Sequence, residues 1–118
     1  MKAVTIHSHG DLSQLKWESV PKPDLDASGD DIIVRIKAAG VNHLDIWVRR
    51  GIPGIKLPHI LGSDGAGIIE SCGKKVTDFN PGEEVIIQPL NFCSKCDYCQ
   101  RGMENYCSDM NILGESSN

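Results

Sequence analysis

The chain has 118 residues, a formal net charge of −4, 40% hydrophobic residues and 24% charged residues. This length and composition fit one globular domain with a single core and exclude a fibre or a disordered tail. The net negative charge argues against nucleic acid as a partner, and no apolar stretch approaches the ~20 residues needed to cross a bilayer. With no apolar stretch at the start either, we expect a cytoplasmic chain without a membrane partner.

Short β-branched segments bounded by Gly or Pro predict a mainly β fold. In the segment 31–38, alternation places four residues on one face, which we expect to be the buried face of a half-buried strand: Ile32, Val34, Ile36 and Ala38. Three further strands are expected at residues 2–8, 67–72 and 84–88. Together these strands predict a barrel-like β domain.

One segment between these strands, residues 42–50, predicts a short helix. Asn42 is suited to cap its start, and Asp45 can answer that cap three residues later. Leu44, Trp47 and Val48 recur at helical spacing. Gly51 can adopt the left-handed conformation that ends a helix.

Four of the five cysteines crowd into fifteen residues with the spacing C-x2-C-x2-C-x7-C: Cys93, Cys96, Cys99 and Cys107. The odd cysteine count and the lack of a signal peptide favour a metal site over a disulfide scaffold. Four thiolates at such spacing can surround one Zn²⁺. A ferredoxin iron–sulfur cluster is the closest alternative, but there the fourth cysteine follows after three residues and precedes a proline.

The cysteine segment, at about residues 90–110, is therefore predicted to be a zinc lobe. Because four protein thiolates fill the tetrahedral shell, no position is left for water or substrate. We expect the zinc to be structural and to hold a loop of low intrinsic order.

Three segments together resemble the medium-chain dehydrogenase/reductase superfamily, which includes zinc alcohol dehydrogenases and quinone oxidoreductases. They are the cysteine lobe, the segment AAGVNHLDIWVRRG and the segment LPHILGSDGAGIIESCGKKVTDFNPGEEV. The resemblance runs from Met1 to about Glu115. It implies a GroES-like, partly open β barrel over residues 1–118, which relatives follow with a Rossmann domain that binds NAD(H) or NADP(H).

No dinucleotide-binding segment is expected within these 118 residues. The glycines at 62–67 read G-x-x-G-x-G rather than G-x-G-x-x-G, and no helical pattern follows them. They are more typical of a turn that leads into a strand. We therefore expect this chain alone to be inactive, with NAD or NADP bound mainly by a missing domain, and we interpret the ending ILGESSN as a cut through a longer chain.

The resemblance to the zinc alcohol dehydrogenases breaks down at the ligands of their second, catalytic zinc. Those enzymes carry a cysteine where this chain has Asn42, a histidine where it has Ser63 and a glutamate where it has Asp64. Asn and Ser are weak ligands for an open zinc site, so no catalytic zinc is expected. Leu44 also replaces the hydroxyl residue that relays the alcohol proton in those enzymes.

These departures favour the quinone oxidoreductase and enone reductase branch, in which hydride passes to a conjugated carbonyl without metal. Asn42, which could donate a hydrogen bond to the developing oxyanion or simply cap the helix, and Asp64 are the candidate catalytic residues. His43 matches the position that can contact the cofactor pyrophosphate. The partners implied are a small-molecule substrate and further copies of the full-length protein, as a homodimer or homotetramer.

Two alternatives remain open at this point. The first is an alcohol or polyol dehydrogenase with an altered catalytic zinc site. The second is a stand-alone GroES-like binding module, which the zinc lobe disfavours. The number of zinc ions per chain separates the first alternative from metal-free hydride transfer.

Overall fold

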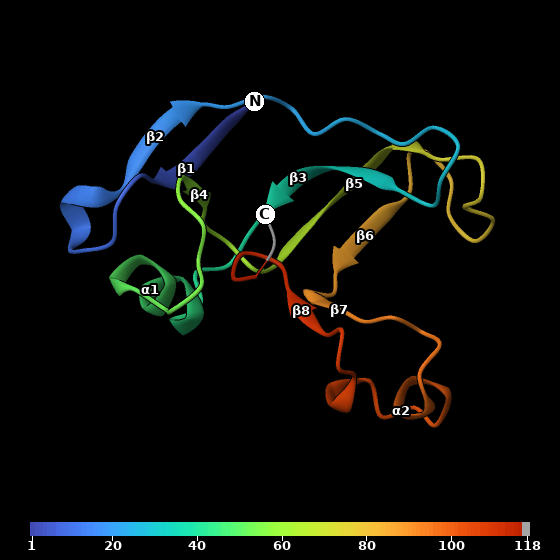
Figure 1. Ribbon diagram of the computed structural model, residues 1–118. Coiled ribbons are helices and arrows are strands. Elements are labelled where there is room, and N and C mark those ends of the chain that lie inside the picture. Colours follow the sequence, from blue (N-terminus) through green and yellow to red (C-terminus); the bar gives the residue numbers. More distant parts are fainter. Residues whose placement is uncertain (117–118) are drawn as a thin grey trace.

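The computed structural model describes residues 1–116, which form a mainly antiparallel β structure with few helices (Figure 1). Two three-stranded sheets have the orders β2-β1-β4 and β3-β5-β6, and β7 pairs with β8. The strands are β1 (Lys2–Ile6), β2 (Lys16–Ser19), β3 (Ile32–Ala38), β4 (His59–Ile60), β5 (Gly65–Cys72), β6 (Glu84–Ile87), β7 (Leu90–Asn91) and β8 (Asn111–Ile112). The helices are α1 (His43–Arg50) and α2 (Asp97–Gln100), with 3-10 turns at Leu12–Gln14 and Glu104–Tyr106.

The two larger sheets lie side by side and do not close into a barrel (Figure 1). The mainly β prediction is confirmed, and the four expected strands correspond to β1, β3, β5 and β6 within about two residues at each end. The strands β2, β4, β7 and β8 were not expected. They have four residues or fewer and lack the run of β-branched residues that marked the equally short β6.

The small apolar core draws its side chains from β1, β5 and α1. Its buried hydrophobic residues outside the cysteine lobe are Ala3, Ile6, Val48 and Ile69. In β5, Gly65, Gly67 and Ile69 alternate as buried positions along the strand. A Cβ at Gly67 would lie 2.4 Å from the carbonyl oxygen of Arg35, so only glycine allows β3 to pass this closely.

The prediction that Ile32, Val34, Ile36 and Ala38 form the buried face of β3 is only partly correct. Ile32 and Val34 are half-buried, but Ile36 is 48% exposed and Ala38 is also exposed. The pairing of β3 with β5 shifts register between Ile33 and Val34 and again between Ile36 and Ala38. Because each irregularity rotates the following side chains, a strict two-residue alternation does not persist along the strand.

The helix predicted at residues 42–50 is confirmed as α1, with Asn42 before it and Gly51 after it. Asn42 precedes it with an extended backbone, and the Asn42 backbone N–H donates to the Asp45 carboxylate over 2.7 Å. Gly51 follows it at a φ of 123°, and its N–H donates to the carbonyl of Trp47. The buried side of the helix carries Val48. These contacts fix the direction from which the helix start approaches the β4–β5 connection.

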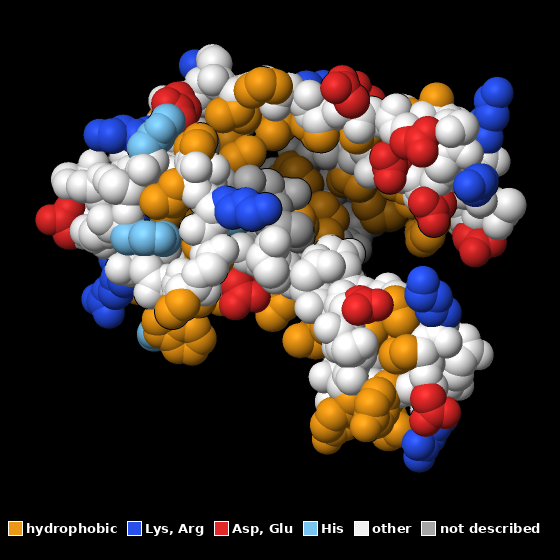
Figure 2. Space-filling view, viewed as in Figure 1, with side chains coloured by type: hydrophobic (Ala, Val, Ile, Leu, Met, Phe, Trp, Pro, Cys, Tyr) orange, Lys and Arg blue, Asp and Glu red, His pale blue; other side chains and the backbone are white. Residues whose placement is uncertain are grey.

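The molecule is more extended than a compact domain of its length. Its radius of gyration is 15.4 Å, compared with about 13.5 Å expected for 118 residues. Figure 2 shows hydrophobic side chains in the central hollow of this face and on the surface of the cysteine lobe. Within residues 1–116, no helix is both long and apolar enough to cross a membrane.

Candidate functional site

The four clustered cysteines converge at the far end of the molecule, in the lobe between β7 and β8 (Figure 1). All four sulfur atoms lie within 4.8 Å of one another. Cys93 Sγ lies 4.0 Å from Cys99 Sγ, and Cys96 Sγ lies 3.5 Å from Cys99 Sγ. Cys107 is buried, and the other three cysteines are half-buried. Residues up to fourteen positions apart in sequence therefore meet at one point.

Tight local backbone turns bring these sulfurs together. Ser94 takes a positive φ of 57°, and the Cys96 N–H donates to Cys93 Sγ over 3.3 Å. On the other side, the Cys93 N–H donates to Cys107 Sγ over 3.5 Å. Gln100 ties the short helix back to the turn by donating from its side chain to the carbonyl of Ser94 over 2.8 Å. Backbone N–H groups thus already point at two of the four sulfurs.

The thiols of the lobe have unlike acidities. The backbone N–H groups of Lys95 and Cys96 lower the pKa of Cys93 to about 6. Partial burial, followed by the hydrogen bond with Cys96, raises the pKa of Cys99 to about 12. A thiol of such high pKa loses its proton at neutral pH only beside a strong positive charge, such as a metal dication.

The donor set fits a zinc ion. Four sulfurs placed about 2.3 Å from one ion, at the corners of a tetrahedron, lie about 3.8 Å apart. The sulfur separations of 3.5 and 4.0 Å fall on either side of that value, and the largest separation allowed in the cluster is 4.8 Å. The N–H groups directed at Cys93 and Cys107 would offset part of the negative charge of four thiolates.

A second polar cluster forms where the start of α1 meets the β4–β5 connection. The Asn42 amide nitrogen donates to Ser63 Oγ over 3.1 Å and to Asp64 Oδ2 over 2.9 Å. The Gly40 N–H donates to Asp64 Oδ1 over 2.7 Å. Asn42 and Asp64 are partly buried, whereas Ser63 is buried. We call the three side chains of Asn42, Ser63 and Asp64 the junction.

The charge of the junction is set by Asp64. The hydrogen bonds from the Asn42 side chain and the Gly40 N–H hold the pKa of Asp64 below its ordinary value of 3.8. Asp64 is therefore ionised at neutral pH. Asp45 lies next to the junction, with one carboxylate oxygen on the Asn42 N–H and the other, Oδ1, buried without a hydrogen-bond partner among residues 1–116.

The junction does not fit a catalytic zinc. Asn42 binds its neighbours through its amide N–H groups, and its amide oxygen is at best a weak, neutral ligand for zinc. Ser63 is a neutral hydroxyl, which leaves Asp64 as the single charged group. Within residues 1–116, the four cysteines are the one set of three or more His, Cys, Asp or Glu side chains that converge on a common point.

His43, the predicted cofactor contact, lies at the first position of α1 and is exposed. Its ring stacks in a tilted arrangement on Trp47, one turn later, with 5.0 Å between the ring centroids. Trp47 is 53% exposed, so it is a surface residue here rather than part of the core. The pair presents an aromatic surface beside the junction.

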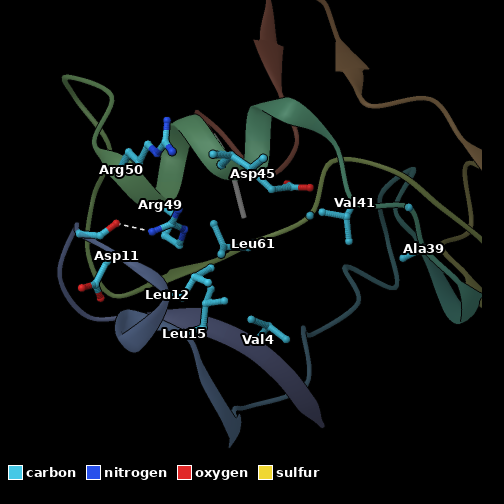
Figure 3. A pocket seen from close by; sticks show the side chains of 14 residues that line it. Val4, Asp11, Leu12, Leu15, Ala39, Val41, Asp45, Arg49, Arg50 and Leu61 are labelled. Carbon is cyan, nitrogen blue, oxygen red and sulfur yellow. Dashed lines mark hydrogen bonds between the residues drawn. The ribbon is translucent and has the colours of Figure 1, made fainter.

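A large pocket lies beside the junction and does not include it. It is open, has a volume of about 1010 Å³ and lies between α1, β1 and the Leu12–Gln14 turn (Figure 3). Arg49 extends across one end and donates to the carbonyl of Gly10. The apolar walls come from Val4, Leu12, Leu15, Ala39, Val41, Ile46 and Leu61. Gly40, Asp45 and Gly62 belong to its lining, so one wall of the pocket is also the outer wall of the junction.

The structure brings together Asn42 and Asp64, which are 22 residues apart in sequence. His43 directly follows Asn42 in the chain. Sequence reasoning missed the direct bond from Asn42 to Ser63 and the contribution of the Gly40 N–H. Ser63 stood out only as a poor zinc ligand, and a backbone N–H leaves no signal in a sequence. The glycines at 62–67 lead into β5 and not into a helix, as expected.

These features define a class of structure: an antiparallel β domain with an appended four-cysteine lobe and a polar junction at the start of a helix. Comparison with known proteins identifies the family. The family described as "Alcohol dehydrogenase GroES-like domain" matches residues 28–116. The chain belongs to this family, which confirms the resemblance and the GroES-like fold.

Individual relatives agree with this assignment. The chain is 38% identical to an alcohol dehydrogenase of Geobacillus stearothermophilus over 98% of its own length and 34% of that protein. It is 33% identical to an alcohol dehydrogenase of Schizosaccharomyces pombe over 95% of its own length and 32% of that protein. A crystal structure of an NAD-dependent alcohol dehydrogenase superposes with a TM-score of 0.91 at 40% identity, covering 100% of this chain and 34% of that one. The chain spans about a third of the length of these relatives.

Proposed function

We propose that this chain is the N-terminal GroES-like domain of an NAD(P)-dependent oxidoreductase that transfers hydride to a quinone, an enone or a similar carbonyl without a catalytic zinc. The observation that carries this proposal is the hydrogen bonding of the junction, in place of metal ligands. Asn42 donates its amide N–H groups to Ser63 and Asp64, so the junction is a hydrogen-bonded polar cluster rather than a set of metal ligands. Hydride addition to such substrates produces a delocalised oxyanion, which hydrogen-bond donors stabilise without a Lewis acid.

The second part of the proposal is one structural zinc on Cys93, Cys96, Cys99 and Cys107. The convergence of the four sulfurs supports it. A bound zinc would supply the cross-link that orders the lobe, because binding and folding are coupled in such sites. Its closed shell would leave it without a role in the chemical step.

The remaining site residues follow from their positions. Asp64 supplies the fixed negative charge of the junction, and its bonds to Asn42 and Gly40 hold that charge in place. His43 lies exposed beside the junction, where a cationic or hydrogen-bonding side chain could meet a cofactor phosphate. NAD or NADP would be held mainly by a further domain. We also propose a cytoplasmic location and a homodimeric or homotetrameric full-length protein.

A steady-state assay of the full-length enzyme tests the reaction. We expect NADH or NADPH to be oxidised in the presence of 2-cyclohexen-1-one or a benzoquinone, and the rate to survive dialysis against a chelator that leaves the structural zinc in place. Turnover of simple alcohols that depends on a second, removable zinc would contradict the proposal.

An alcohol or polyol dehydrogenase is the second candidate, because the names of the relatives favour it. They include alcohol dehydrogenases and a sorbitol dehydrogenase of Bacillus subtilis that is 31% identical over 96% of this chain. In this alternative, Asp64 would be one ligand of a metal completed by groups outside these 118 residues. Oxidation of sorbitol or a primary alcohol with NAD, together with two zinc ions per full-length chain, would favour it.

A further inference from the structure

The hydrogen bonds of the junction leave one side-chain proton, that of the Ser63 hydroxyl, without an acceptor among residues 1–116. The Asn42 amide carries two protons, and both have acceptors, in Ser63 Oγ and Asp64 Oδ2. Asp64 is ionised and has no proton to give. The Ser63 hydroxyl accepts from Asn42 but carries a proton of its own, and no group in the described part of the chain accepts it. Ser63 therefore holds the free donor of the junction, and Asn42 does not.

The surroundings of Ser63 favour a donor role. Ser63 is 5% exposed, so water competes little for its proton. A buried hydroxyl proton without an acceptor is unfavourable, because burial removes its hydrogen bond to water. This cost is removed when a ligand presents an oxygen to Ser63. The large pocket is lined by the neighbouring Gly62, with Gly40 and Asp45, and a substrate in it would lie one residue along the chain from Ser63.

We infer that the Ser63 hydroxyl is a catalytic residue that donates a hydrogen bond to the carbonyl oxygen of the substrate. Asn42 is then a positioning residue, which holds Ser63 and Asp64 in one orientation. The inference rests on the proposed function and moves the donor role from Asn42 to Ser63. It makes the presence of an acceptor oxygen on the substrate a requirement for turnover.

The chemistry balances without a proton leaving Ser63. A hydride from reduced NAD(P)H, which becomes NAD(P)+, adds to the β-carbon of the conjugated ketone. The C=C electron pair shifts to form the enolate, the C=O π pair moves onto oxygen, and the hydrogen bond from Ser63 stabilises the negative charge there. The proton that completes the product comes from water. The bonds from Asn42 and Gly40 to Asp64 offset part of the carboxylate charge that would otherwise repel this oxygen.

Three serine variants of the full-length enzyme test the inference with 2-cyclohexen-1-one as substrate. Ser63→Ala removes the donor and is expected to lower kcat about 100-fold, as for other single donors to an oxyanion, with little change in the KM of the cofactor. Ser63→Thr keeps the hydroxyl and is expected to restore most of the activity. Ser71→Ala in β5 is the matched control and is expected to retain kcat, because it lies outside the junction.

A second measurement covers the case in which the Ser63 variants fold poorly. In the wild-type 118-residue chain, both side-chain amide protons of Asn42 are expected to exchange slowly with solvent in NMR spectra, because both are hydrogen-bonded. Fast exchange of either proton would return the donor role to Asn42 and overturn the inference. If the Ser63→Ala variant keeps the turnover rate of the wild type, the inference alone is overturned. If the wild type turns over no conjugated ketone or quinone, the proposed function is overturned as well.

Discussion

The two sheets and the cysteine lobe are held together in different ways. Within each sheet, antiparallel backbone pairing joins the strands, and the buried apolar side chains of this region include Ile6, Val48 and Ile69. The lobe has two-residue strands, a four-residue helix and a single buried apolar residue, Cys107. Within one chain, therefore, one region is stabilised by burial of side chains, whereas the other lacks the apolar area to fold in that way.

This contrast shows where a metal is needed. The ordered backbone of the lobe loses conformational entropy that its few contacts do not offset. In the proposed zinc site, coordination of one ion by four thiolates would replace the missing core, since binding energy becomes folding energy. Four predictions follow from this contrast, from the largest expected effect to the smallest. Each is compared with a control variant in the other region or at a matched position.

The largest effect is expected on removing a zinc ligand. Cys107→Ser should abolish zinc binding and disorder the lobe, because structural zinc sites contribute on the order of 10 kcal/mol to folding. The sheets should keep their structure. Hydrogen exchange, followed by mass spectrometry, should show loss of protection for residues 90–112 and little change in β1, β3 and β5.

The matched control for that variant is Cys72→Ser, since Cys72 lies in β5, away from the cluster. It should leave zinc content and exchange in the lobe unchanged. If Cys107→Ser unfolds the two sheets together with the lobe, the two regions are one cooperative unit and the contrast between them is wrong.

The next effect concerns the apolar core. Ile69→Ala in β5 removes a side chain that is 2% exposed and should lower the free energy of unfolding of the sheets by about 2–5 kcal/mol. Ile86→Ala in β6 deletes the same atoms from a side chain that is 85% exposed and should cost far less. Urea unfolding followed by far-UV circular dichroism measures both, and equal losses would mean that Ile69 is not in the core.

A smaller difference is expected between two glycines with positive φ. Gly114 has a φ of +78°, and a Cβ there would lie 2.1 Å from the Gly62 carbonyl oxygen, whereas Gly102 in the lobe has a φ of +70° and open space around it. Gly114→Ala and Gly102→Ala share the backbone strain, but only the first forces the β4–β5 connection to move. Gly114→Ala should be less stable by an additional ~1–3 kcal/mol in thermal unfolding. Equal stabilities would show that the two segments are not packed together.

The smallest effect is the pH dependence from Asp64. Because its folded pKa is lowered, Asp64 contributes stability above its unfolded pKa of about 3.8, and this contribution is lost as the pH falls through the folded value. Asp64→Asn should therefore be less stable than the wild type at pH 7, with the difference shrinking at pH 3 and below. Asp109→Asn in the lobe is the comparison variant. A difference for Asp64→Asn that is the same at pH 7 and pH 3 would exclude this titration.

The sequence predicted features that local chemistry decides. The spacing of the four cysteines indicated their convergence, and Asp45 and Gly51 marked the two ends of α1, because ligand spacing and helix ends depend on nearby residues. The β3 face was partly wrong, since bulges in the β3–β5 pairing depend on the partner strand and leave no pattern within β3 itself.

The junction could be predicted only in part. Asn42, Ser63 and Asp64 were singled out as residues standing where relatives hold zinc, but their mutual hydrogen bonds depend on how α1 meets the β4–β5 connection. That meeting is tertiary, and no periodicity reports it. The allocation of protons, which makes Ser63 the free donor, follows only from the geometry.

Metal content per chain, measured by elemental analysis on the wild type and on Cys107→Ser, tests the central claim most directly. We predict one zinc per wild-type chain, none in the variant, and still one per chain in the full-length protein. A wild-type chain without zinc or with iron in its place would contradict the structural site, and a second zinc in the full-length protein that is lost on Asp64→Ala would contradict metal-free chemistry at the junction.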